Sequence, residues 1–555
     1  MTPVSRPMTR REIGAVLFAG LALSMYFTWP LAWQPAGLGR MEIGDGMFSV
    51  WNIAWVAYAL TTPGVNLFDA NIFYPHQTTL AFSEPNIGAG ALAVPAYLLT
   101  DGNPYAAHNS AVLIGLTGAF VGMYLLARRL TGSPEASVIS AITFAFCPFF
   151  FARTAHVQLM MTGPLPFVLL AFHRFADDPT WRRAVVLGVS LGIQALFCSY
   201  YGVMAGLLTA LGILVFAGVD GNWRRVRWWG LALFAAVVSL VTVLPILVPY
   251  LQLQTETGFE RTLQEAYRYS ADWRAYFASS AAAHDWMLPL LGRWNEVLFP
   301  GFTVLLGGAI GIALVFRRGH VGVRRVTALF YLLVLTVALW SSFGPAAGLY
   351  SLLYKTLPVF SLLRAPARFG LAVTFALSVF TAIAAAAMLR KLPARRRQWV
   401  TALVALTVIA ELSTHIPYRP ARGVPRAYKV LRAAERGAVV EFPFYHRPED
   451  RFRHTLYMLG STWHWQPLVN GYSDYIPPDF IEGAPLVGSF PTPAGFAWLQ
   501  ERRARYAIFH LGLYDASSRE ALRQQIASHA EYLRPMWTRD SVLLYEIVGW
   551  PPLTP

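Results

Sequence analysis

An aspartate between two glycines is the first feature of this sequence that could do chemistry. Asp45 lies between Gly44 and Gly46, directly after the first long apolar run, and Glu84 lies further along the same segment. A carboxylate at a membrane surface can take a proton from a hydroxyl group, because partial loss of water raises its pKa. The alternatives are a helix cap for Asp45 and a solvated loop position for Glu84. Both residues are candidate catalytic groups, and candidate ligands for Mg²⁺ or Mn²⁺ if the protein uses a metal.

Four basic side chains could hold a phosphate. Arg153 and His156 lie between two apolar runs, and Arg364 and Arg368 precede another. A guanidinium group suits phosphate because it can bind two oxygens at once. The spacing of Arg364 and Arg368 predicts one shared helix face if the following helix begins early, although Pro366 lies between them. The alternative is that these side chains reach the lipid headgroups.

A third group of residues suits contact with a sugar, because it combines aromatic rings with amide groups. The candidates for acceptor or sugar binding are Trp51, Asn52, Tyr200, Tyr201, Trp463, Asn470 and Tyr472. Two alternatives stay open, since aromatic residues also anchor proteins at membrane interfaces, and residues 463–475 could be a packed loop.

The elements that position these residues are mostly transmembrane helices. Of the 555 residues, 55% are hydrophobic and 14% are charged, values typical of a polytopic membrane protein. A span needs about 20 apolar residues. Eleven windows meet this need approximately, at 12–33, 105–127, 136–152, 157–173, 184–199, 201–218, 228–251, 300–316, 326–342, 367–389 and 398–415.

The placement of arginine predicts the orientation. With the N-terminus in the cytoplasm, every predicted inner loop contains at least two arginines, whereas the much longer outer loops contain few. The formal net charge of +15 is therefore explained by loops facing anionic lipid, and we expect no nucleic-acid partner. Cys147 and Cys198 lie inside apolar runs, which indicates buried thiols and neither a disulfide nor a zinc site.

Two domains are predicted. Residues 1–416 form the transmembrane unit, with outer loops at 34–104, 252–299 and 343–368. The first loop contains Trp51, Trp55 and Tyr58 at near-helical spacing, which predicts a helix with its aromatic face on lipid headgroups. A second interfacial helix is predicted at about 87–99, and an irregular turn at 71–76.

Residues 417–555 form an outer α/β domain. Its predicted helices cover 425–435 and about 517–533, the latter opened by a capping box at Ser517. Its predicted strands cover 439–442, 506–509 and 542–547.

The chain resembles the membrane glycosyltransferases of the GT-C superfamily. The resemblance rests on an acidic residue in a long first outer loop, a second acidic position further along it, many spans and a C-terminal outer domain. The motifs GDG at 44–46, FSE at 82–84, LRAPARF at 363–369 and VNGYS at 469–473 are most similar to the bacterial YfhO-like branch. An Asp-Xaa-Asp motif common in the superfamily is missing, which leaves the metal open.

The resemblance implies an enzyme of the bacterial cytoplasmic membrane. It would transfer a sugar from a polyprenyl-phosphate donor to a glycan, lipid or protein acceptor on the outer side, with inversion at the anomeric carbon. Asp45 would be the base, Glu84 would assist, and the four basic residues would hold the phosphate. The alternatives are a transporter or flippase of lipid-linked saccharides, and a non-catalytic scaffold for envelope assembly.

Overall fold

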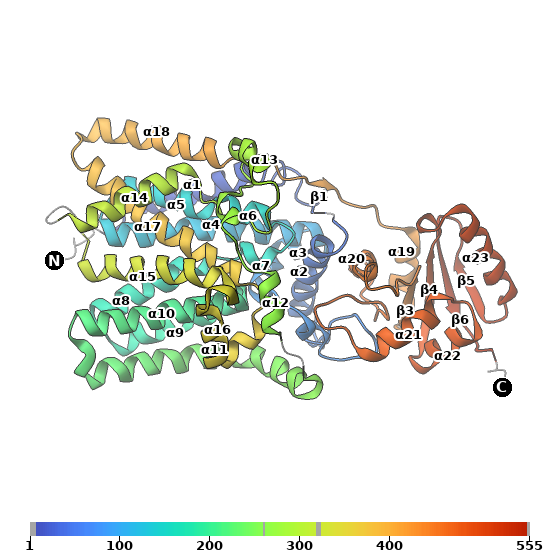
Figure 1. Ribbon diagram of the computed structural model, residues 1–555. Coiled ribbons are helices and arrows are strands. Elements are labelled where there is room, and N and C mark those ends of the chain that lie inside the picture. The colour runs from blue at the N-terminus through green and yellow to red at the C-terminus, as the bar shows by residue number, and fades with distance from the viewer. Residues whose placement is uncertain (1–6, 41, 259–260, 318–322, 552–555) are drawn as a thin grey trace. The chain divides into compact units, whose positions relative to one another are not determined.

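The computed structural model describes residues 7–40, 42–258, 261–317 and 323–551. Its chain divides into two compact units. The first unit contains residues 1–33, 112–248 and 254–417, and is helical. The second contains residues 34–111, 249–253 and 418–555, and includes the sheet (Figure 1). The predicted outer loop at 34–104 therefore shares a compact unit with the C-terminal domain.

All eleven predicted spans are helical. The corresponding elements are α1 (Arg10–Phe27), α4 (Pro104–Thr131), α5 (Pro134–Ala145) with α6 (Pro148–Ala152), α7 (Val157–Met160) with α8 (Pro164–Asp177), α9 (Trp181–Phe197), α10 (Ser199–Val219), α11 (Val226–Thr257), α14 (Phe302–Phe316), α15 (Arg325–Ser342), α17 (Gly370–Leu389) and α18 (Ala394–Leu412). Within the described ranges, seven segments are long and apolar enough to cross a membrane. The chain is a multi-pass membrane protein. Helices α1, α9, α14 and α18 fall short of that length or hydropathy.

The first unit is held together by close helix packing around α17. Almost every side chain of α17 is buried. Helix α14 approaches it at Gly311, where an added Cβ would lie 2.1 Å from the Phe380 carbonyl oxygen. A small residue at such a crossing lets two helix backbones approach each other within a membrane.

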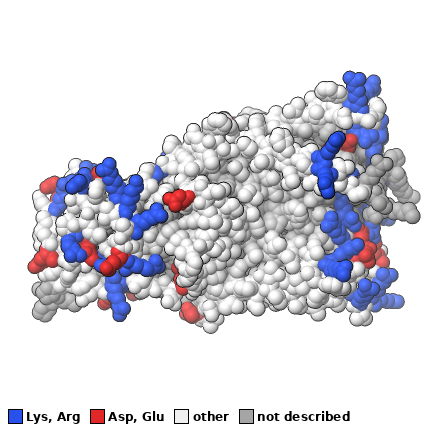
Figure 2. All heavy atoms as spheres, turned by 180° about the vertical axis from the view of Figure 1, so that it is seen from behind, with Lys and Arg blue, Asp and Glu red and all other residues white. Residues whose placement is uncertain are grey.

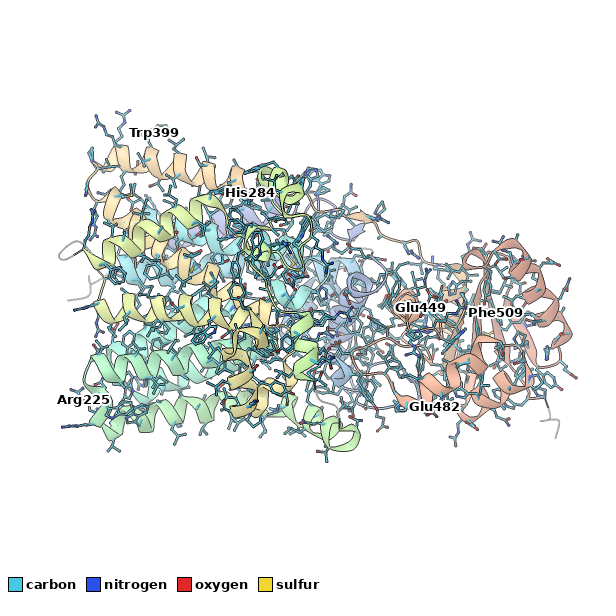
Figure 3. The ribbon with its side chains drawn as sticks, viewed as in Figure 1. Arg225, His284, Trp399, Glu449, Glu482 and Phe509 are labelled. Atoms are coloured by element: carbon cyan, nitrogen blue, oxygen red, sulfur yellow. The ribbon has the colours of Figure 1, made fainter. Side chains whose placement is uncertain are left out.

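The predicted inner loops gather at one end of this unit. Figure 2 shows Lys and Arg concentrated there, while the helix bodies carry almost no charge. Figure 3 places Arg225 at this end and His284, from a predicted outer loop, towards the other. Arg324 forms ion pairs with Asp177 at 3.0 Å and with Asp220 at 2.5 Å, which link the loops at this end. The alternation of loops predicted from arginine placement is therefore consistent with the fold.

The shorter elements of the first unit lie in its outer loops. They are α12 (Leu263–Arg268), α13 (Leu288–Leu291) and α16 (Leu349–Thr356), with 3₁₀ turns η3 (Arg274–Phe277), η4 (Ala282–Met287), η5 (Gly344–Ala347), η6 (Pro358–Leu362) and η7 (Pro366–Phe369). A further turn, η2 (Asn222–Arg224), lies at the basic end.

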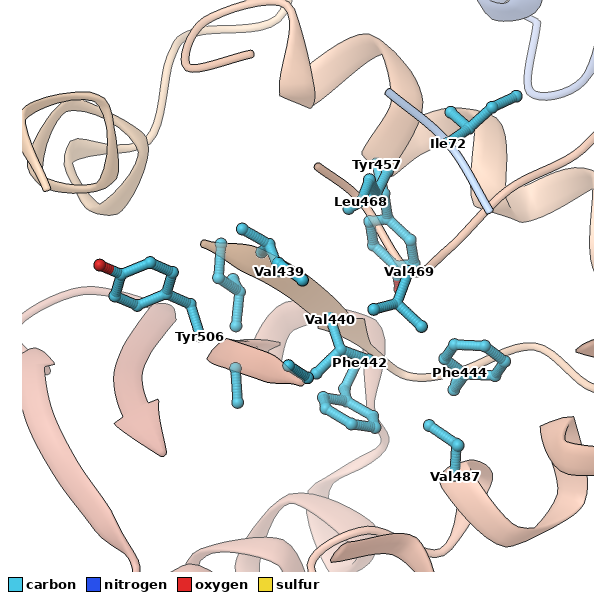
Figure 4. Close-up of a cluster of buried hydrophobic side chains, with 14 of the residues drawn as sticks. Ile72, Val439, Val440, Phe442, Phe444, Tyr457, Leu468, Val469, Val487 and Tyr506 are labelled. Atoms are coloured by element: carbon cyan, nitrogen blue, oxygen red, sulfur yellow. The ribbon is translucent and has the colours of Figure 1, made fainter. Parts of the chain in front are cut away.

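The second unit contains a four-stranded sheet of order β3-β4-β6-β5. Strands β3 (Ala438–Phe442) and β4 (Ala504–His510) are parallel, and β6 (Val542–Ile547) is antiparallel to both β4 and β5 (Leu533–Trp537). The core side chains on β3, β4 and neighbouring loops appear in Figure 4. Another pair, β1 (Leu38–Gly39) and β2 (Arg419–Pro420), joins the first loop to residue 420.

The helices of this unit come from both parts of the sequence. They are α2 (Asp45–Thr61), α3 (Ile87–Leu99), α19 (Arg426–Ala433), α20 (Thr455–Ser461), α21 (Pro478–Gly488), α22 (Pro493–Glu501) and α23 (Ala516–Ser528), with 3₁₀ turns η1 (Thr79–Phe82), η8 (Arg451–His454) and η9 (Leu511–Leu513). The helix predicted from Ser517 instead begins after Asp515, whose side chain caps it by accepting from the Ser518 amide at 2.8 Å. It ends at Ser528, since residue 533 already belongs to β5.

The interfacial role predicted for α2 is wrong. The helix exists, but its aromatic face packs inside the second unit. Trp51 and Trp55 are buried, and the Tyr58 ring stacks on Trp465 with a centroid distance of 4.6 Å. The sequence pattern could not distinguish lipid from protein as the partner of this face, because both favour the same aromatic residues.

Two buried histidines predict how the stability of this unit depends on pH. Burial lowers the pKa of His454 to about 4 and that of His464 to about 3. In the unfolded chain a histidine titrates near 6.5. Between these values only the unfolded state gains the proton, so stability falls as pH falls from about 6.5 to about 4. The slope is about 1.4 kcal/mol per pH unit for each histidine.

Urea unfolding of this unit at pH 6.5 and pH 4.5, followed by pulse proteolysis in detergent, measures this effect. His454→Gln should lower the slope of stability against pH by the contribution of one histidine, about 1.4 kcal/mol per pH unit. His415→Gln, at an exposed position, should leave it unchanged. Equal slopes for His454→Gln and the unaltered protein would contradict the assignment.

Candidate functional site

Asp45 is the first residue of α2 and directly follows its cap position. The cap position is Gly44, which makes no side-chain cap and has φ +105°, a conformation that suits only glycine. The Gly44 amide donates to Thr455 Oγ1 at 2.8 Å, which fixes the start of the helix against α20. The Asp45 side chain is exposed at this end, where the helix dipole favours negative charge. The N-cap position is therefore held by Gly44, and Asp45 lies in the first turn of the helix.

Gly46, the glycine after Asp45, is favoured for a different reason. A Cβ on Gly46 would lie 3.0 Å from Glu42 Oε2 and 3.2 Å from the Arg40 carbonyl oxygen. Arg40 and Glu42 form an ion pair. Two further charged groups thus lie beside the first turn of α2. Sequence reasoning missed them, although Glu42 precedes Asp45 by only three residues.

Glu84 is positioned by the same helix, further along it. Its carbonyl oxygen accepts from Asn52 Nδ2 at 3.2 Å. Asn52 follows Asp45 by seven residues, so it lies on the same face about 10 Å along the axis. Across the described ranges, no three His, Cys, Asp or Glu side chains form a group that could hold a metal. We derive no step through a metal ion.

A carboxylate that the sequence did not single out lies near Glu84. Asp474 Oδ2 accepts from the Ser83 hydroxyl at 3.0 Å. The hydroxyl of Tyr250 donates to the Ser83 carbonyl oxygen at 2.5 Å and interacts electrostatically with both Glu84 and Asp474. The FSE motif at 82–84 is therefore hydrogen-bonded to a second acidic residue, Asp474, which belongs to the C-terminal domain.

Several predicted sugar-binding residues are buried in this unit. Trp51 donates from Nε1 to Asn71 Oδ1 at 3.2 Å, and Asn52 has no exposed surface. Asn470 is also buried, and its amide accepts from the Glu441 amide at 2.7 Å and donates to the Glu441 carbonyl oxygen at 2.8 Å. These three side chains therefore stabilise the fold of the second unit. Tyr472 is half-buried, with its ring at the edge of the Phe48 ring.

The first unit brings together part of the predicted phosphate site. The guanidinium group of Arg368 lies over the Tyr200 ring, 4.9 Å from its centroid. Burial lowers the pKa of Arg153, and the charge of Arg368 lowers it further. Tyr201 interacts electrostatically with both arginines. Two like charges held close together, both partly buried, favour an anion beside them.

Arg153 has an acidic partner, Glu296, with which it forms an ion pair. No spacing in the sequence pointed to Glu296, because it lies far along the chain in the second outer loop. His156 begins the next short helix as its cap residue, and its amide donates to the Arg153 carbonyl oxygen at 2.8 Å. Arg153 and His156 thus share one turn.

The predicted helix face for Arg364 and Arg368 is wrong. Pro366 starts the 3₁₀ turn η7, and α17 begins only at Gly370, so Arg364 lies outside any helix. Arg364 instead lies over the Tyr269 ring at 5.4 Å and 3.8 Å from Glu265. The proline disfavours a helix through Arg364 because it moves the preceding residue, Ala365, out of the α region, to φ −124° and ψ 82°.

Tyrosine hydroxyls hold the segment that carries these arginines. Tyr200 donates to the Ala365 carbonyl oxygen at 2.5 Å, and Tyr350 donates to that of Leu363 at 2.8 Å. Tyr200 and Tyr201, predicted to bind sugar, therefore lie beside the basic group and are buried.

Part of the chain matches a known protein family. Residues 89–248, less than half of the sequence, match the model of the dolichyl-phosphate-mannose-protein mannosyltransferase family. This segment includes Arg153, Tyr200 and Tyr201. The sequence matches no curated protein.

Solved structures with a similar chain path are distant in sequence. The archaeal oligosaccharyltransferase AglB from Archaeoglobus fulgidus, in complex with an inhibitory peptide and a dolichol-phosphate, is 14% identical. The TM-score is 0.45, over 98% of this chain and 75% of that one. ArnT from Cupriavidus metallidurans is 12% identical, with a TM-score of 0.42, over 98% and 100%. TM-scores below 0.5 do not establish a shared function.

The backbone conformation of Gly44 predicts that a substitution at this position lowers the stability of the second unit. Gly44→Ala would force a side chain into a conformation that costs about 1–3 kcal/mol and would shift the first turn of α2. The second unit should unfold at lower urea concentration by pulse proteolysis in detergent. Gly37→Ala, which has open space around it, is the matched control. An unchanged midpoint for Gly44→Ala would show that this turn tolerates a side chain.

Proposed function

We propose that this protein is a membrane glycosyltransferase of the GT-C kind. It would transfer a sugar from a polyprenyl-phosphate donor to a hydroxyl group of a glycan, lipid or protein on the outer side of a bacterial cytoplasmic membrane. The observation that carries the proposal is the paired guanidinium groups of Arg153 and Arg368, because they suit a lipid phosphate. The family match over residues 89–248 supports it. Within the superfamily, the short motifs favour the YfhO-like branch.

Each residue would have one role in an inverting displacement. Asp45 takes the proton of the acceptor hydroxyl as its oxygen forms the bond to the anomeric carbon. The bond from that carbon to the phosphate oxygen breaks, and the phosphate leaves with both electrons. Arg153 and Arg368 stabilise the leaving phosphate, with Arg364 and His156 as further contacts. Glu84 orients the acceptor.

The base assignment predicts a loss of turnover without a loss of donor binding. Asp45→Asn should lower kcat by about 10²- to 10⁴-fold, because the amide cannot accept the proton. The measurement is release of polyprenyl phosphate by purified protein supplied with polyprenyl-phosphate sugars and envelope acceptors. Glu482→Gln, which changes an exposed carboxylate, is the control. Undiminished turnover in Asp45→Asn would remove Asp45 from this role.

The phosphate assignment predicts weaker donor binding. Arg368→Gln should raise the Kd of the donor lipid about tenfold or more, because a hydrogen bond to a charged group is lost. Arg225→Gln, at the basic end of the helices (Figure 3), should leave the Kd unchanged. Translocation of a fluorescent donor lipid without any transfer would favour the flippase alternative instead.

A further inference from the structure

Two cavities in the second unit lie on either side of one tryptophan. The first has a volume of about 190 Å³ and the second about 300 Å³. Trp463 lines both. Neither cavity is lined by the candidate catalytic carboxylates or by the basic group of the first unit, so the mechanism above leaves them unused.

The first cavity combines aromatic walls with basic groups. Tyr428 and Tyr457 line it, and both hydroxyls are engaged elsewhere: Tyr428 donates to Glu441 Oε2 at 2.7 Å and Tyr457 to the Pro443 carbonyl oxygen at 2.8 Å. Both side chains are buried, and the Tyr457 ring stacks on Tyr445 and on His510, so these tyrosines form a fixed wall of the cavity. The ring with exposed surface is that of Trp463, which is half-buried. Such a ring suits the apolar face of a sugar, which carries its C–H bonds.

One group of this cavity suits a negative charge, and another suits a hydroxyl group. Arg422 lines it and is exposed, and it forms no ion pair with any residue in the described part of the chain. His510 also lines it, and its Nε2 lies 2.5 Å from Oε2 of Glu441, a carboxylate with no exposed surface. Within the same described ranges, His510 Nδ1 has no hydrogen-bond partner. Because the Nε2 hydrogen of the neutral imidazole is directed to Glu441, Nδ1 carries a lone pair and can accept a hydrogen bond from a ligand hydroxyl.

The second cavity carries charges of both signs. It is lined by Tyr58, Trp465 and Tyr97, of which Trp465 donates from Nε1 to the Tyr97 hydroxyl at 3.2 Å. Asp101 and Arg432 also line it, and both interact electrostatically with Tyr97. The Asp101 carboxylate can accept hydrogen bonds and the Arg432 guanidinium group can donate them. Beside aromatic rings, these two groups suit the hydroxyl groups of a neutral sugar.

The two cavities follow one face of α2. Met47 lines the first and Tyr58 the second. Eleven residues separate them, which places both on one side of the helix about 16 Å apart along its axis. The first cavity has room for about six water molecules, which suits one sugar ring. A saccharide that fills both cavities must therefore contain several rings.

We propose that the second unit binds an acidic oligosaccharide along α2. A uronate ring occupies the first cavity, with its carboxylate on Arg422 and one of its hydroxyls donating to His510 Nδ1. A neutral sugar occupies the second cavity, with Trp463 between the two sugars. Met47 is two residues from Asp45, so the uronate lies next to the first turn of α2. This oligosaccharide is the acceptor; that role, unlike the binding itself, rests on the proposed function.

Binding of defined saccharides to the full-length protein in detergent tests the proposal by calorimetry. The acidic probes are tetrasaccharides of hyaluronan and of polygalacturonate, the neutral probe is chitotetraose, and inorganic phosphate reports on anion binding alone. At least one acidic tetrasaccharide should bind, at least tenfold more tightly than chitotetraose. Lack of binding by both acidic probes, equal binding of acidic and neutral probes, or binding of phosphate with equal affinity would overturn the proposal.

Matched variants locate the site. Arg422→Gln should weaken binding of the acidic probe at least tenfold, whereas Arg436→Gln, at another exposed arginine, should not. Trp463→Ala should weaken both acidic and neutral probes, and Trp463→Phe should restore most of the affinity because it keeps a ring. Trp537→Ala, on β5, is the control. An unchanged affinity in Arg422→Gln would place the site elsewhere.

Asp45→Asn separates this inference from the proposed function. It should bind the acidic probe as the unaltered protein does, because Asp45 lines neither cavity. Loss of transfer with retained binding supports both proposals. Binding without transfer in the unaltered protein would support the saccharide site and contradict the proposed glycosyltransferase activity. Transfer without saccharide binding would support the activity and contradict the saccharide site.

Discussion

The side-chain amide of Asn71 is the interaction on which the second unit depends. It accepts from Trp51 Nε1 on α2 and donates to the Ser461 hydroxyl at 3.0 Å and the Gln466 carbonyl oxygen at 3.1 Å. The adjoining backbone, residues 71–74, exchanges further hydrogen bonds with residues 468–470. A buried amide must have its partners, since an unsatisfied one costs about 1–3 kcal/mol. This one fixes α2, and with it Asp45 and both cavities, on the C-terminal domain.

Charge organises the first unit in two different ways. At the basic end, arginines meet acidic partners such as Asp177 and Asp220, so the charges join the loops between helices. At the other end Arg153 and Arg368 lie close to each other, with Glu296 on one side and the Tyr200 ring on the other. The net positive charge of this group is partly buried and held in place, which suits an anionic ligand. The ion pairs at the basic end instead stabilise the arrangement of the loops.

The glycines around Asp45 show how a functional motif can have structural reasons. Gly44 is required by its backbone angle, and Gly46 is favoured by the closeness of the Arg40 carbonyl oxygen. Neither requirement depends on a substrate. The motif GDG therefore fixes where the helix begins and how its first carboxylate is presented, and any catalytic role of Asp45 follows from that presentation.

The sequence by itself determined the helices of the eleven predicted spans, the alternation of loops and the class of protein, because hydrophobic length and arginine placement are local properties of the chain. It also determined β3, β4 and β6 and the existence of α2. Tertiary structure alone decided what each face meets. It turned Trp51 and Trp55 inward, placed Asp474 beside the FSE motif, gave Arg153 its partner Glu296 and enclosed the two cavities around Trp463. These pairings join residues far apart in the chain, and no spacing in one sequence records them.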